Sequence, residues 1–296
     1  MLEQWIAEHT IHRITAGSHL YGTARLDSDI DTRGVCLMPP AALLGLAPFE
    51  QYQQHNAEQD VEIYGLTKFV QLALNSNPNI ADILFAPPET WQVQSYYWND
   101  IWQIRHSFLS QKVVHTFSGY AHAQLKRLEG HRKWLLNPPD HQPTVVEFGG
   151  ELRNTDKGGQ YNWFYYRSQE DGYNSALATW NQYQTWRKER NPKRAVGERL
   201  VGYDTKHGAH LVRLLLKAQA ILTTADYNPI LASVELAMVQ EVLAGAWSYE
   251  ELIAWTVQQD ELVHNITTVL PKQPDFKLVE NVLMQINRQT CLDYAS

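Results

Sequence analysis

The sequence is poor in cysteine and has no long apolar run, and each absence excludes a class of protein. Only two cysteines, Cys36 and Cys291, occur in 296 residues, and they lie far apart in the chain. Cys36 lies in an apolar, strand-like run, so we expect a buried free thiol in a reducing compartment rather than a disulfide. No apolar run approaches the length of about 18 residues that a membrane-spanning helix needs.

The first residues also lack the charged, apolar and small-residue order of a signal peptide, and no internal repeat or low-complexity segment occurs. We therefore expect a soluble cytoplasmic protein without a membrane partner. An excess of positive charge is missing too, because 25 Lys and Arg stand against 32 Asp and Glu, a net charge of −7. The chain as a whole is thus not a basic nucleic-acid coat. Its length allows a sizeable core and two domains.

The most informative stretch, residues 16–35, joins two strand-like runs through a glycine-serine turn and a short polar connection. Gly17 lacks the Cβ that would block a close approach, and a short helix starting at Ser18 would present N–H groups to phosphate. Asp29 and Asp31, two residues apart on a strand, are expected to project from one face. Such a pair repels unless a cation lies between its members, and Mg²⁺ prefers oxygen ligands. The pattern predicts phosphoryl or nucleotidyl transfer.

This motif, GSHLYGTARLDSDID, resembles the signature of the DNA polymerase β-like nucleotidyltransferase superfamily. The longer form, with Tyr21-Gly22 after the turn and Arg33-Gly34-Val35 after the aspartates, is similar to the predicted nucleotidyltransferases associated with RNA ligases. The resemblance implies transfer of a nucleoside monophosphate from an NTP, ATP among them, to an acceptor hydroxyl. Mg²⁺ is the implied cofactor, with Mn²⁺ as a substitute.

A third carboxylate is expected in the alternating run from Asp60 to Tyr64, in which Asp60 and Glu62 share a face. The resemblance implies an acid on a strand beside the first pair, and this run is the matching place. Asp60 is where the RNA-ligase-associated group carries its acid, whereas Glu62, between two apolar residues, fits the general superfamily form. Both stay open, with Asp60 preferred. The simpler alternative is a pair of solvated residues on an edge strand.

A second informative stretch predicts a helix from about residue 205, with Lys206, His210 and Arg213 at positions i, i+4 and i+7 of one face. Such a row could hold an NTP triphosphate or the phosphates of the acceptor. The alternative is that these are polar residues of helix packing. His207 and His210 have a spacing compatible with metal ligation, but no Cys pair lies nearby to complete a zinc site. The run YDTKHGAHLVRLL again resembles the RNA-ligase-associated group.

Charge is distributed unevenly along the chain. Residues 126–217 contain 16 Lys or Arg and 10 Asp or Glu, an excess of six positive charges within a chain of −7. This asymmetry predicts a basic face that could accept an RNA backbone, because neutralised phosphates dominate such binding. A solvated helical surface explains the same asymmetry without RNA.

Hydrophobic periodicity predicts an α+β fold. We expect a small mixed β-sheet nucleotidyltransferase domain flanked by helices over residues 1–100, then a mainly α-helical domain with the basic face over 101–296. The predicted strands are 11–16, 30–38 and 60–64, and the predicted helices include 2–9, 66–74, 113–128 and 176–190. Residues 41–59 are expected to form a loop or short helix, and residues from about 91 onward to be helical. The aromatic run 163–166 is expected to serve in packing.

The function predicted from the sequence is two-metal nucleotidyl transfer to RNA, in RNA repair or end modification, with a functional link to an RNA ligase. The alternatives are a non-catalytic RNA- or nucleotide-binding module and NMP transfer to a protein or small molecule. The predicted catalytic residues are Asp29, Asp31, Asp60 and Glu62, of which Asp29, Asp31 and Asp60 bind metal. The predicted nucleotide-binding residues are Gly17, Ser18, Arg33, Lys206, His210 and Arg213.

Overall fold

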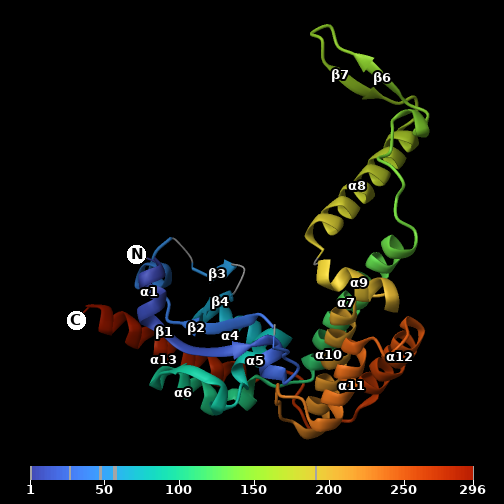
Figure 1. Ribbon diagram of the computed structural model, residues 1–296. Helices are drawn as coiled ribbons and strands as arrows, with labels where there is room; N and C mark the ends of the chain where they lie inside the picture. The colour runs from blue at the N-terminus through green and yellow to red at the C-terminus, as the bar shows by residue number, and fades with distance from the viewer. Residues whose placement is uncertain (1, 27, 47–48, 56–58, 191, 296) are drawn as a thin grey trace. The chain divides into compact units, whose positions relative to one another are not determined.

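The computed structural model describes residues 2–26, 28–46, 49–55, 59–190 and 192–295 (Figure 1). The chain forms two compact units. The first contains residues 1–125 and 206–296, and the second contains residues 126–205. The first unit therefore places the C-terminal helices with the N-terminal sheet. The predicted functional division at residue 100 stays a prediction.

The first unit is built on a mixed five-stranded sheet with the strand order β3-β4-β2-β1-β5. Strand β2 runs antiparallel to β1 and parallel to β4, while β3 and β5 add antiparallel strands at the two edges. The strands are β1 (Thr10–Ala16), β2 (Ile30–Cys36), β3 (Gln51–His55), β4 (Gln59–Gly65) and β5 (Trp91–Gln94).

Helices flank this sheet and continue into the second half of the chain. The shorter ones are α1 (Leu2–His9), α2 (Gly17–Tyr21), α3 (Pro40–Leu44), α4 (Leu66–Leu74), α5 (Pro78–Leu84) and α6 (Tyr96–Gln103), with 3₁₀ turns η1 (Pro88–Thr90) and η2 (Arg105–Phe108). The longer ones are α7 (Lys112–Leu136), α10 (Thr205–Thr224), α11 (Ser233–Ala244), α12 (Tyr249–Asn265) and α13 (Phe276–Ala295). Residues of α13 contact α3, α4 and α6, which places the end of the chain beside the N-terminal part.

Local sequence explains the elements around the sheet. Helix α4 buries its apolar residues at spacings of three and four, among them Leu66, Phe69 and Val70, which is the stripe of a one-sided helix. Helix α5 begins at Asn77, whose side chain accepts hydrogen bonds from the N–H groups of Asn79 and Ile80 and so caps the helix. The core between sheet and helices is apolar and aromatic, with Ile14, Leu66, Phe69 and Trp98 fully buried.

The second unit contains the end of α7, the 3₁₀ turn η3 (Val146–Phe148), helices α8 (Arg167–Glu189) and α9 (Pro192–Val201), and a two-stranded hairpin of β6 (Glu151–Asn154) and β7 (Gln160–Trp163). Figure 1 shows the hairpin extending past the N-terminal end of α8. Aromatic side chains pack between α7 and α8, where Trp134 and Trp186 have ring centroids 5.5 Å apart.

The α+β prediction is confirmed, as are the strands expected at 11–16, 30–38 and 60–64. Two local predictions were wrong. Residues 41–59 contain strand β3 as well as a short helix, and residues 91–94 form strand β5 where helix was expected. The run 163–166 is largely exposed, with only Phe164 half-buried. Cys36 is a buried free thiol as predicted, and burial raises its pKa to about 12.

Candidate active site

One row of residues crosses four strands at the same end of the sheet. The strand registers pair Ala16 of β1 with Asp31 of β2, Asp31 with Asp60 of β4, and Asp60 with His55 of β3. Because β2 and β4 are parallel neighbours, equivalent residues on them point to the same face. Two of the predicted carboxylates, Asp31 and Asp60, therefore lie side by side on adjacent strands.

The glycine-serine turn lies directly against this row. Strand β1 ends at Ala16, and Gly17 begins the short helix α2 with a positive φ of 62°. A Cβ placed on Gly17 would overlap Oδ2 of Asp31 and lie 3.0 Å from its Cγ. A residue with a side chain at position 17 is thus excluded both by the backbone conformation and by the Asp31 carboxylate. The predicted turn and the predicted carboxylate are in contact.

Arg33 lies two residues after Asp31 on the same face and joins the carboxylates of β2 and β4. Its Nη2 donates to Oδ2 of Asp60 at 2.8 Å, and its Nη1 donates to the Asp60 backbone oxygen at 2.8 Å. Its Nε lies 3.4 Å from Oε2 of Glu62, and Nη2 lies 4.0 Å from Oδ1 of Asp31. One guanidinium therefore neutralises part of the charge of three acids. The sequence predicted Arg33 as a phosphate ligand and gave no sign of this arrangement.

Burial and neighbouring charges set the protonation of Asp31. Partial burial raises the pKa of this carboxyl above its ordinary value, the charges of Asp60 and Asp29 raise it further, and Arg33 and Lys206 oppose the increase. The net shift is upward. The upward direction comes mainly from burial, because the charges of Arg33 and Lys206 oppose those of Asp60 and Asp29.

The other two predicted acids have different surroundings. Asp29 lies in the connection just before β2 and is exposed, so only its charge reaches Asp31 here. Glu62 is paired in register with Arg33 and accepts a 2.7 Å hydrogen bond from Nε2 of Gln53. Asp60, rather than Glu62, is the acid in register with Asp31.

The three predicted helix residues are all on α10 but differ in burial. Lys206 is exposed in the first turn, and its charge acts on Asp31. His210 is half-buried, with its Nδ1 3.4 Å from Nη2 of Arg213. The Arg213 side chain is 3% exposed and pairs with Asp82, at 3.3 Å from Nη1 to both carboxylate oxygens. Of the three, Lys206 is the one whose charge is directed at the acidic row.

Asp82 is the centre of a buried network that sequence reasoning missed. Tyr21 donates to Oδ2 of Asp82 at 2.7 Å, Tyr227 donates to Oδ1, and the Arg213 guanidinium stacks 3.9 Å from the Tyr21 ring centroid. Burial, together with the Asp82 charge, raises the pKa values of both tyrosines. The signal was available, because Asp82 is an acid inside an otherwise apolar helix, where a charge requires a partner. The network fixes the end of α2, and hence the turn at Gly17, to α5 and α10.

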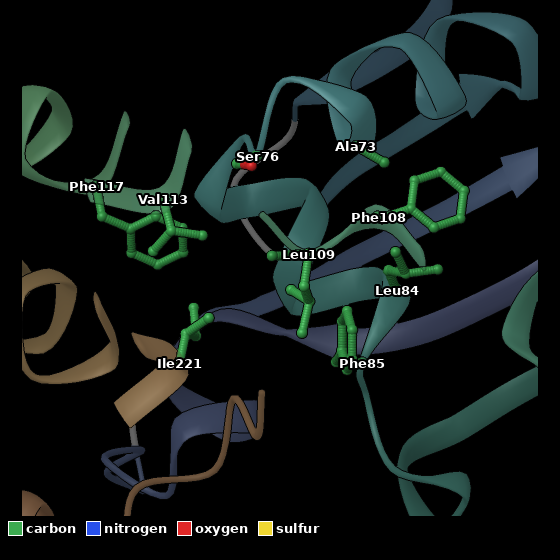
Figure 2. A pocket seen from close by; sticks show the side chains of 10 residues that line it. Ala73, Ser76, Leu84, Phe85, Phe108, Leu109, Val113, Phe117 and Ile221 are labelled. Atoms are coloured by element: carbon green, nitrogen blue, oxygen red, sulfur yellow. The ribbon is translucent and has the colours of Figure 1, made fainter. Parts of the chain in front are cut away.

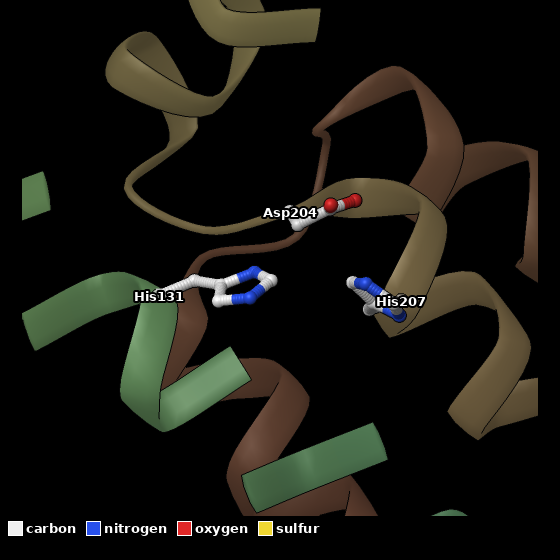
Figure 3. A group of neighbouring side chains, drawn as sticks. All are labelled: His131, Asp204 and His207. Atoms are coloured by element: carbon white, nitrogen blue, oxygen red, sulfur yellow. The ribbon is translucent and has the colours of Figure 1, made fainter. Parts of the chain in front are cut away.

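One apolar pocket and one cluster of side chains do not compete with this site. The apolar pocket of Figure 2, lined by residues such as Phe85, Phe108 and Phe117, has a volume of about 10 Å³, which suits no nucleotide. Figure 3 shows His131, Asp204 and His207, three side chains of metal-binding type. His131 and Asp204 belong to the second unit and His207 to the first, where its Nδ1 lies 2.8 Å from Oε1 of Gln124. We assign no metal site to them.

Comparison with known proteins gives both the class of this protein, a polymerase-β-like nucleotidyltransferase, and its family. The chain belongs to the RlaP family, described as the RNA repair pathway DNA polymerase beta family, whose model matches residues 2–272. This assignment covers both compact units, since the matched range includes the whole of residues 126–205.

Two individual proteins are similar to parts of the chain. An uncharacterized 38.9 kDa protein of Enterobacteria phage T4 is 31% identical over 90 residues, which is 27% of this chain and 26% of that protein. The chain thus matches about a quarter of the length of that relative. A nucleotidyltransferase-like protein from Exiguobacterium sibiricum aligns over 89% of this chain and 78% of its own, with 10% identity and a TM-score of 0.25, a likeness too low to support a conclusion. Within the described residues, no helix is long and apolar enough to cross a membrane.

Proposed function

We propose that this protein transfers a nucleoside monophosphate from an NTP to a hydroxyl group of RNA, in a reaction that requires Mg²⁺. The observation that carries the proposal is the contact between Asp31 and the Gly17 turn, together with the register that sets Asp60 beside Asp31. Gly17, which has no side chain, thus lies in a turn next to two carboxylates, Asp31 and Asp60, on one face of the sheet. Membership of an RNA repair pathway family supports RNA as the acceptor.

The residues of the row fit a magnesium site. Asp31 and Asp60 offer hard oxygen donors on adjacent strands. Asp29, which is exposed, lies directly before β2 in the chain. Burial raises the pKa of Asp31, and the charges of Asp60 and Asp29 raise it further, so a cation bound beside these acids would favour the ionised carboxylate. We therefore assign Asp29, Asp31 and Asp60 as metal ligands. Bound Mg²⁺ supplies charge neutralisation at the phosphates and lowers the pKa of the attacking hydroxyl.

The remaining roles follow from position. Gly17 and Ser18 hold the terminal phosphates, because only a residue without Cβ leaves room beside Asp31. Lys206, exposed and acting on Asp31, neutralises charge that develops on the departing pyrophosphate. Asp60 accepts the hydroxyl proton, while Glu62 and Gln53 hold the other side of Arg33 and of the strand pair. Arg33 orients Asp60 through two 2.8 Å hydrogen bonds.

Two predicted ligands receive a supporting role in this proposal. The Arg213 guanidinium is buried and paired with Asp82, so we assign it to the placement of α2 and α10 rather than to phosphate contact. His210 lies against Arg213 and belongs to the same placement. The three residues predicted on one helix face thus have two different roles. The charge of Lys206 acts on Asp31, whereas His210 and Arg213 fix the position of α10.

The experiment that tests the function uses the purified full chain with each of the four α-³²P-labelled NTPs and MgCl₂, with and without total RNA. We expect label in RNA with at least one NTP, and no label when EDTA replaces MgCl₂. Label that appears on the protein itself in the absence of RNA would favour the alternative of protein modification. No labelled product with any NTP would contradict nucleotidyl transfer and leave a nucleotide- or RNA-binding module.

A further inference from the structure

The β6–β7 hairpin presents an aromatic face that the proposed chemistry does not use. The register pairs Glu151 with Trp163 and Arg153 with Tyr161, so these four residues share one face of the ribbon. Every residue of the two strands is exposed except Arg153, which is half-buried. The Tyr161 and Trp163 side chains are 44% and 38% exposed, although aromatic rings of this size are normally covered. The ring of Tyr165, just beyond β7, extends the face and is 60% exposed.

Polar contacts hold these rings in place. The guanidinium of Arg153 lies 4.2 Å from the Trp163 ring centroid, and its Nη2 lies 3.2 Å from Oε2 of Glu151. Tyr165 donates a 2.9 Å hydrogen bond to the other oxygen of Glu151. Glu151 is thus an internal partner whose charge is offset by Arg153. A two-stranded hairpin is only marginally stable alone, so a fixed aromatic face on it indicates a surface organised for contact.

The charge of the second unit decides which partner suits this face. Residues 126–205 carry 13 Lys or Arg and 10 Asp or Glu, an excess of three positive charges, whereas the remainder of the chain carries a net charge of −10. Lys157 at the hairpin turn and Arg167 at the start of α8 are both exposed. A polyanion is attracted to the unit, while the same unit of a second copy, which carries the same positive excess, is repelled from it.

We propose that this face, formed by Arg153, Tyr161, Trp163 and Tyr165, is a stacking surface for single-stranded nucleic acid. Exposed aromatic rings and a guanidinium plane stack on bases of any sequence, and neighbouring lysine and arginine side chains contact the phosphates. Duplex bases are already stacked on each other, so the face selects single strands. The identification of the bound nucleic acid as RNA rests on the proposed function. The stacking of bases on this face does not depend on it.

The test measures fluorescence anisotropy of a 5′-fluorescein-labelled 12-nucleotide RNA of mixed sequence, as a single strand and as a duplex. The full chain is titrated at constant salt without NTP or divalent metal. We expect Trp163→Ala and Tyr165→Ala each to weaken single-strand binding about fivefold or more, and Trp163→Phe to retain binding. The matched control is Leu152→Ala, because Leu152 is 59% exposed on the opposite face of the same hairpin and should bind as the unmodified protein does.

Unchanged single-strand binding by Trp163→Ala and Tyr165→Ala would overturn the proposal. An equal loss of binding in the control Leu152→Ala would also overturn it, and so would a wild-type protein that binds the duplex more tightly than the single strand. Tyr165 lies beyond the last ladder pair, so its replacement leaves the strand pairing intact even if Trp163→Ala loosens the hairpin. Sedimentation that reveals a dimer lost in Trp163→Ala would assign the face to a second copy and also overturn it. The binding assay contains neither NTP nor divalent metal, so it gives its result whether or not the protein transfers NMP, and failure of the transfer chemistry and failure of this surface are told apart.

Discussion

Asp31 lies in the space that a side chain at position 17 would occupy. A Cβ on Gly17 would overlap the Asp31 carboxylate, and the positive φ of Gly17 disfavours any residue with a side chain there. Gly17 and Asp31, the first and last residues of the motif GSHLYGTARLDSDID, therefore form one structural feature. The Asp31 carboxylate can keep its position only while residue 17 is glycine, and the proposed contact of the turn with phosphate depends on the same condition.

Gly17→Ala should therefore displace the Asp31 carboxylate and lower the rate of NMP transfer by about a hundredfold, the penalty of misplacing a group by roughly 1 Å. The matched control is Gly22→Ala. Gly22 has a similar positive φ of 82°, but a Cβ there would meet only Leu236, at 4.0 Å. Both variants should lose about 1 kcal/mol of stability from backbone strain. Equal transfer rates in the two variants would show that Gly17 has no role beyond its backbone conformation.

Asp31→Asn should raise the melting temperature at pH 7 in the absence of divalent metal. Burial and neighbouring acids raise the pKa of Asp31 in the folded protein, so its ionisation costs folding stability above that pKa and costs nothing below the ordinary value of 3.8. The stability difference between variant and wild type should accordingly disappear as the pH falls toward that value. MgCl₂ should stabilise the wild type but not the variant. A variant less stable than wild type at pH 7 would contradict this reading of the site.

His12 supplies a separate pH prediction for the sheet that carries the site. Its ring is buried, stacks 3.8 Å from the Trp98 ring, and lies with Nδ1 3.2 Å from the Val93 oxygen. Burial lowers the pKa of His12 from 6.5 to about 3, so the unfolded chain takes up a proton between these values and the folded protein does not. Stability is thus lost as the pH falls below 6.5.

His12→Phe keeps a ring against Trp98 and removes this titration. The stability of the wild type relative to His12→Phe should fall by about 3 kcal/mol between pH 7 and pH 4, measured by urea unfolding at each pH. Parallel pH profiles for the two proteins would show that His12 does not stay neutral in the folded state.

The buried pair of Asp82 and Arg213 should be strongly coupled. Asp82→Ala leaves a buried guanidinium and two tyrosine hydroxyls without their acceptor, at a cost of about 3–5 kcal/mol. Arg213→Met leaves the carboxylate without its countercharge and should cost a similar amount. The double variant should lose much less than the sum, because it buries neither charge alone. Additive losses in urea unfolding, within about 0.5 kcal/mol, would show that the two groups do not interact.

The parts of the site that follow from short stretches of sequence could be predicted. Gly17 and Asp31 belong to one local motif, and the alternation from Asp60 to Tyr64 is itself a strand signal. Their orientation toward one face follows from strand geometry, which is the same in every sheet. Strand geometry does not give the pairing of strands, so the register was needed to show that Asp60, and not Glu62, lies beside Asp31.

The parts that depend on contacts between distant residues could not be predicted. Arg33 joins acids on two strands, and Arg213 pairs with Asp82, 131 residues earlier in the chain. Strand β3 has the sequence QYQQH, in which only Tyr52 is half-buried, so it lacks the apolar alternation that marks a strand. The strands of the hairpin are exposed on both faces, so a buried apolar face does not mark them as strands in the sequence.

The most direct test of the central claim is the initial rate of labelled NMP incorporation into RNA by Asp31→Asn and Asp60→Asn, at saturating NTP and MgCl₂. Glu89→Gln, which replaces an exposed acid in η1, serves as the control. We expect incorporation to fall below detection in both aspartate variants while they remain folded, and to stay at the wild-type rate in Glu89→Gln. Incorporation by folded Asp31→Asn at a rate comparable to wild type would contradict the assignment of this acidic row as the active site.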